Sequence, residues 1–130
     1  MLQNFYPQLA GFHGFVRWVV LAIGLCAIIV AFSGWRSTTP PGRKFLGLGI
    51  FFVVAMDVGL LSGLLLYAAG QPFLRSAFLG HGVIMLLAVL LAHLGGALTR
   101  KAPSDVLKYR IPAIVWTVSL LVMLAGIPRR

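Results

Sequence analysis

The chain has 130 residues, of which 60% are hydrophobic and only 10% are charged. A soluble domain carries roughly a quarter charged residues, so the composition excludes a soluble globular protein and leaves no stretch for a soluble catalytic domain. The formal net charge of +9 comes from 11 Lys+Arg against 2 Asp+Glu. The basic residues flank apolar segments, where lipid headgroups favour them, and so do not indicate nucleic-acid binding.

Four apolar segments are long enough to cross a bilayer as helices, which takes about 20 residues each. We expect spans at about 12–35, 44–69, 80–98 and 110–127. The first ten residues lack the basic region and cleavage pattern of a signal peptide, so the first span should be retained. The prediction is an all-α integral membrane protein, a four-helix transmembrane bundle forming a single domain over residues 1–130.

The connections between these spans have local signals of their own. Pro40-Pro41 prevents the first helix from continuing into the second. We expect a short interfacial connection over residues 73–79. In the third connection, Ser104 can cap a helical turn that begins at Asp105.

The basic residues also predict the topology. One side of the membrane has three basic residues, with Arg17 just inside it: Arg75, Arg129 and Arg130. The other side has seven: Arg36, Arg43, Lys44, Arg100, Lys101, Lys108 and Arg110. The positive-inside rule places the side with seven in the cytoplasm, so both termini should lie on the non-cytoplasmic side.

Two histidines are expected at one depth near the outer face. His13 lies 22 residues before Trp35, and His81 lies 19 residues before Arg100, which correspond to roughly 33 and 28 Å of helix. Spans one and three run in the same direction, so the two imidazoles can face one another, as bis-histidine ligation of a haem iron requires. Glycines flank both and leave room for a flat macrocycle. Alternatively, each histidine is an interfacial residue bonded to water, headgroups or backbone.

Arginines near these histidines are candidate partners for the haem propionates. Arg17 follows His13 by one helical turn, on roughly the same face. Arg75 precedes span three and could serve in the same way. Arg17 also has a structural alternative, an ion pair with Asp57, because a long side chain could bridge their difference in depth.

Two further ionisable residues lie inside the membrane, where such residues are costly. Asp57 falls near the middle of span two, and its functional alternative to the Arg17 ion pair is proton binding. His93 lies 7 residues before Arg100, and no other histidine shares its depth. We expect His93 to make an interhelical hydrogen bond, line a quinone pocket or contact a partner subunit.

The chain resembles small four-span bacterial membrane proteins that are labelled hypothetical or cytochrome b-like. The resemblance covers nearly the whole chain. Where such proteins show an acidic residue before the span-three histidine, this chain has Gly80. The matching features are His13 with Arg17-Trp18, Asp57 with the following stretch 60–67, His81 with 85–88 and His93, and Ser104-Asp105 with Lys108 and Arg110.

The leading prediction is a b-type cytochrome-like subunit with one haem b, held by His13 and His81, that transfers electrons within a larger respiratory or photosynthetic complex. The resemblance implies the bacterial inner (plasma) membrane as its location. Other membrane subunits or further copies of this chain are the expected protein partners, and quinone is a further candidate. The alternatives are a non-redox accessory subunit that contacts pigment, lipid or quinone, and a small proton-coupled transporter using Asp57. An electron-transfer or accessory role is favoured over an autonomous enzyme.

Overall fold

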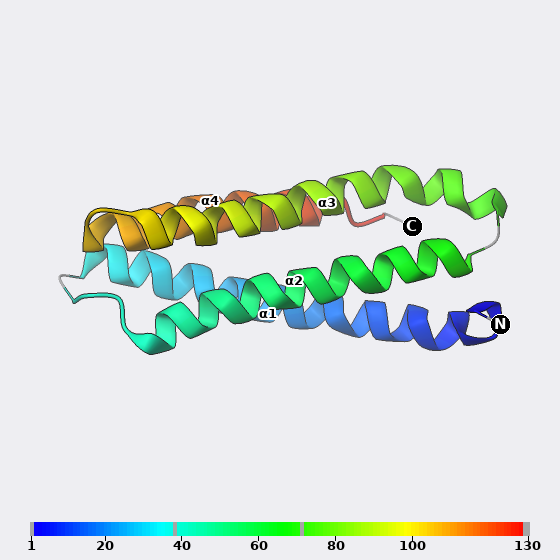
Figure 1. The fold of residues 1–130 in the computed structure, drawn as a ribbon, viewed down its shortest axis with the longest axis horizontal. Coiled ribbons are helices and arrows are strands. Elements are labelled where there is room, and N and C mark those ends of the chain that lie inside the picture. Colours follow the sequence, from blue (N-terminus) through cyan, green and yellow to red (C-terminus); the bar gives the residue numbers. More distant parts are fainter. Residues whose placement is uncertain (1, 38, 71, 129–130) are drawn as a thin grey trace.

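The computed structural model describes residues 2–37, 39–70 and 72–128, and among them the side chains of 3–37, 39–70 and 78–128. A short 3-10 turn, η1, leads into four long helices (Figure 1). Each helix contains a segment long and apolar enough to cross a membrane. The predicted all-helical fold with four potential membrane spans is therefore confirmed. The elements are η1 (Leu2–Phe5), α1 (Tyr6–Arg36), α2 (Arg43–Ala69), α3 (Pro72–Lys101) and α4 (Asp105–Ala125).

The helix boundaries differ from the prediction at two connections. Residues 73–79, expected as an interfacial connection, are part of α3, which begins at Pro72. The fourth helix begins at Asp105 rather than near Arg110, because the Ser104 side chain accepts a hydrogen bond from the Leu107 amide at 3.2 Å. This contact confirms the predicted cap. The earlier start places Pro112 inside α4, where its ring is fully buried against the other helices.

The four helices form a bundle in which each helix contacts two neighbours. α1 packs against α2 and α4, and α3 packs against the same two helices. Among the described residues, α1 and α3 therefore lie on a diagonal and run in the same direction (Figure 1). η1, the end of α2 and the start of α3 lie together at one end of the bundle (Figure 1), and Arg129 and Arg130 lie outside the described residues.

An aromatic cluster fills the core in the half of the bundle where α4 begins. The Trp116 indole N–H donates to the Ala92 carbonyl at 3.2 Å, and the ring lies between Gly49 of α2 and Gly95 of α3. Glycine at both positions lets the helix backbones approach the ring closely, as small residues do in membrane bundles. The neighbouring rings of the cluster are Phe45, Phe52 and Tyr109.

At the opposite end only three helices continue, because α4 is the shortest of the four helices. It ends at Ala125, while α1, α2 and α3 continue past it (Figure 1). A helix end leaves backbone carbonyls without partners inside the helix. The end of α4 therefore brings a free carbonyl group into the bundle at the level of His81 and His13.

Candidate functional site

His13 is held by a hydrogen bond from α1 to α2. Its Nδ1 lies 2.8 Å from the Ser62 hydroxyl oxygen, and that hydroxyl donates to the Gly59 carbonyl at 2.9 Å. Because the Ser62 hydrogen points to Gly59, its oxygen is left to accept, so His13 Nδ1 carries the proton and donates. Gly63 provides the space for the ring, since a Cβ there would lie 3.2 Å from His13 Cε1.

His81 is held in the same way by the end of α4. Its Nδ1 lies 2.6 Å from the Gly126 carbonyl oxygen. A carbonyl can only accept, so His81 Nδ1 also carries a proton. Gly126 lies tightly against α3, where an added Cβ would come 2.6 Å from Ile84 Cγ2 and 2.7 Å from Met85 Cε. The absence of a side chain at Gly126 is therefore what allows its carbonyl to reach His81.

The two imidazoles approach one another across the diagonal of the bundle. Their ring centroids are 6.4 Å apart and their planes are 85° to one another. In each ring Nδ1 is the protonated nitrogen, so the Nε2 lone pair remains available, as in most metal-ligating histidines. With metal–imidazole bonds of about 2.0 Å, two imidazoles on opposite sides of one metal have centroids roughly 6 Å apart. The observed separation fits such a pair, and it is also an ordinary distance for a direct edge-to-face contact between two rings.

The donor set distinguishes between kinds of metal site. Among the described residues, no group of three or more His, Cys, Asp or Glu side chains could hold a metal ion. A zinc site needs three or four protein ligands. A haem iron takes four nitrogens from the porphyrin and requires from the protein only axial ligands. The His13–His81 pair fits the second requirement and not the first.

The glycines around the two histidines have no neighbouring helix against them, and Gly11, Gly80 and Gly82 are exposed on the surface of the bundle. A Cβ built on any of the four would meet no atom within 4 Å outside its own stretch of helix: Gly11, Gly14, Gly80 and Gly82. They therefore do not serve close helix packing, in contrast to Gly49 and Gly95 in the aromatic core.

The structure describes the side chain of only one of the two arginines that were predicted to contact the haem propionates. The Arg17 guanidinium lies over the Trp18 ring, 5.2 Å from its centroid, in a cation–π contact. It lies one turn from His13 on α1 and remains a candidate partner for an acidic group. Arg75 belongs to α3, and its side chain lies outside the described residues.

The predicted Arg17–Asp57 ion pair is wrong. Asp57 instead binds His93, with Oδ1 2.8 Å from Nε2, and this contact confirms the interhelical hydrogen bond predicted for His93. Side chains lean toward the N-terminus of their own helix. Because α2 and α3 are antiparallel, Asp57 and His93 lean toward one another from different depths, whereas Asp57 and Arg17 lean apart.

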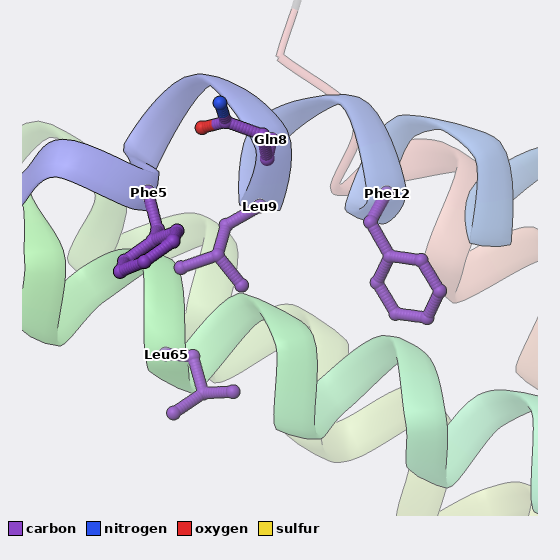
Figure 2. Close-up of a pocket in the computed structure, with 5 residues that line it drawn as sticks. All are labelled: Phe5, Gln8, Leu9, Phe12 and Leu65. Atoms are coloured by element: carbon purple, nitrogen blue, oxygen red, sulfur yellow. The ribbon is translucent and has the colours of Figure 1, made fainter. Parts of the chain in front are cut away.

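A shallow apolar groove of about 420 Å³ lies at the end of the bundle where α1 begins and α2 ends. In Figure 2, the side chains of Phe5, Leu9 and Phe12 extend toward α2, which contributes Leu65, and Gln8 completes the lining. Such a lining suits a hydrocarbon chain and offers no ligand to a metal.

Two members of the site were not foreseen from the sequence. Ser62 and Gly126 hold the histidines, but their contacts join residues 49 and 45 positions apart in the chain. The only local signal was the spacing of Gly59 and Gly63, which indicated that another helix approaches α2 near Ser62.

No protein-family model, curated protein or solved structure matches this chain. The resemblance to cytochrome b-like proteins therefore remains a prediction. Any assignment of function rests on the geometry of the two polar pairs.

Replacing Ser62 with alanine tests whether the Ser62 hydrogen bond orients His13 for ligation. The substitution leaves the His13 Nδ1 proton without its acceptor, and loss of such a supporting bond typically lowers metal affinity by about 10- to 100-fold. We expect haem titration of Ser62→Ala to show a drop of this size. Ser119→Ala is the matched control, because Ser119 is also buried but donates to the Ala88 carbonyl. Equal affinities of the two variants would contradict the proposed role.

Proposed function

We propose that this chain is a b-type cytochrome-like membrane subunit that binds one haem through His13 and His81. The observation that supports it most directly is the pairing of the two imidazoles across the bundle, with centroids 6.4 Å apart. Each ring is oriented by a hydrogen bond through Nδ1, and each keeps its Nε2 lone pair. Side chains of facing helices hold cofactors in this way in other bundles.

The haem would supply one-electron redox chemistry. The chain's contribution is to fix the tautomer and orientation of both ligands, through Ser62 and Gly126 respectively. Two histidine ligands leave no open coordination position, which favours electron transfer over oxygen chemistry. Arg17 would provide a positive charge for an acidic substituent of the macrocycle. We place this function within a respiratory or photosynthetic complex of the bacterial inner membrane.

The test is a reduced-minus-oxidised absorption spectrum of the full chain, expressed with sufficient haem and purified in detergent. We expect a sharp α-band and a stoichiometry approaching one haem per chain. A colourless protein that remains folded and is not reconstituted by added haem would overturn the proposal.

The apolar groove favours a second candidate function, that of a non-redox accessory subunit. The groove lined by Phe5, Leu9, Phe12 and Leu65 could seat the tail of a lipid, pigment or quinone. This candidate predicts that the colourless chain co-purifies with a larger complex and that the complex assembles poorly without it. A complex that assembles equally well in a deletion strain would contradict the accessory role.

The Asp57–His93 pair favours a third candidate, proton-coupled transport. The pair lies at membrane depth, but on the outer surface of the bundle, so a pathway within one chain would not reach it. In liposomes, Asp57→Asn should abolish proton-coupled flux if Asp57 carries the proton. Unchanged flux would dismiss that role.

A further inference from the structure

The Asp57–His93 pair lies on the lateral surface of the bundle, where α2 and α3 face away from the other two helices. Its side chains are 47% and 51% exposed, respectively, although they bond to one another at 2.8 Å. The side chains that flank the pair on the two helices are exposed and apolar: Val54, Leu61, Leu86 and Leu90. We call these four residues, with Asp57 and His93, the α2–α3 face. In a single chain within a bilayer, this polar pair would contact hydrocarbon.

Hydrocarbon is a poor environment for this pair. Ionisable residues within membrane spans almost always face a bundle interior or a water-filled cavity, because lipid cannot form hydrogen bonds to them. The internal contact uses only His93 Nε2 and Asp57 Oδ1. Among the described residues, His93 Nδ1 and Asp57 Oδ2 have no partner, so they remain to be satisfied by something that covers the α2–α3 face.

When the pair is electrically neutral overall, the hydrogen-bonding atoms that remain after the internal bond are complementary to those of a second, identical pair. If the pair is imidazolium and carboxylate, His93 Nδ1 can donate and Asp57 Oδ2 can accept. If it is neutral imidazole and carboxylic acid, Asp57 Oδ2 donates and His93 Nδ1 accepts. Either form leaves one donor and one acceptor after the internal bond. A second, two-fold related pair satisfies both, and this is the arrangement that a symmetric dimer interface requires.

We propose that a second copy of this chain covers the α2–α3 face, forming a two-fold dimer around the Asp57–His93 pairs. In this dimer His93 of each copy bonds the partner's Asp57 as well as its own, which closes a ring of four side chains. The flanking apolar residues pack against their counterparts and exclude lipid from the ring. The dimer does not depend on haem, since His81 and His93 are 12 residues apart on α3, roughly 18 Å along the helix axis.

Disulfide cross-linking in phospholipid vesicles can map the interface. Cys26 is the only cysteine, so a Cys26→Ser background allows one cysteine at a time to be introduced. Test positions on the α2–α3 face are Val54, Leu61, Leu86 and Leu90, and controls on the exposed surfaces of α1 and α4 are Leu25, Ile114 and Leu121. We expect cross-linked dimer at one or more test positions, at least fivefold above all controls. Cross-linking that is equal at test and control positions would overturn the proposal.

A second measurement tests whether the polar pair holds the dimer together. Energy transfer between labelled copies, diluted with lipid, gives the dissociation constant within the bilayer. We expect the double variant Asp57→Leu with His93→Leu to dimerise at least tenfold more weakly, since it removes every interhelical hydrogen bond of the ring. The exchanged variant, Asp57→His with His93→Asp, keeps the groups and should retain the dimer. A wild-type chain that stays monomeric at all lipid dilutions would show that another molecule covers this face and would refute the dimer.

Discussion

Alanine in place of His81 is expected to eliminate the low-spin haem α-band of the purified protein, and His13→Ala should do the same. Each substitution removes one of the two histidines proposed to hold the haem, and none of the other described His, Cys, Asp or Glu side chains joins them in a cluster that could replace it. The remaining histidine could support only a five-coordinate haem with weaker retention. Absorption spectra of reduced and oxidised protein, with haem quantified per chain, measure both effects.

The control for this experiment is His93→Ala. His93 bonds Asp57 on the α2–α3 face and contributes nothing to the His13–His81 pair. The α-band of this variant should keep its position and intensity. Adding free imidazole to the His13→Ala or His81→Ala protein should partly restore the low-spin spectrum, because the small ligand can occupy the vacated position. An α-band that survives both single substitutions would contradict ligation by these histidines.

The shared depth of His13 and His81 could be predicted because it depends only on regular helix geometry. α1 and α3 run in the same direction, and a constant rise per residue converts sequence distance into depth. The rotation of each helix about its axis is set by packing across the bundle, which the sequence expresses weakly. The sequence therefore indicated that the two rings could meet, but not that Ser62 and Gly126 hold them.

The partner of Asp57 could not be predicted from depth in the membrane alone. Helix rise counted from the helix ends places Asp57 nearer in depth to Arg17 than to His93, but this count leaves out the leaning of side chains toward the N-terminus. In an antiparallel pair such as α2 and α3, two leaning side chains can span about two helical turns between their Cα atoms. A long Arg17 side chain could not compensate, because it extends in the opposite direction and contacts Trp18.

The position of the core was also less predictable than the spans themselves. A membrane helix is apolar on every side, so its hydrophobic pattern does not separate the lipid-facing surface from the core. What marks the core here is the distribution of small residues, with Gly49 and Gly95 on either side of the Trp116 ring. Glycines in open space, such as Gly47 and Gly82, have the same identity and no packing role.

This distinction leads to opposite expectations for two adjacent glycines of α3. At Gly95 an added Cβ would lie 2.7 Å from both Cδ1 and Nε1 of the Trp116 ring, closer than real Cβ atoms approach. The ring cannot withdraw, because Gly49 of α2 lies close to its other side and its N–H bonds the Ala92 carbonyl. Gly95→Ala should therefore destabilise the bundle by about 1–3 kcal/mol, the usual cost of overpacking a core.

At Gly96 the nearest atom to an added Cβ is Val53 Cγ2 at 4.0 Å, which is an ordinary contact. Gly96→Ala should leave stability unchanged or raise it by up to about 1 kcal/mol, because alanine is the better helix former. Unfolding in detergent micelles with increasing SDS, followed by helicity and by tryptophan fluorescence in a Trp18→Phe, Trp35→Phe background that leaves Trp116 as the only tryptophan, measures both variants against the parent chain. Two glycines one residue apart should thus differ in the sign of their effect. Equal tolerance of alanine at both positions would show that the indole is not fixed between α2 and α3.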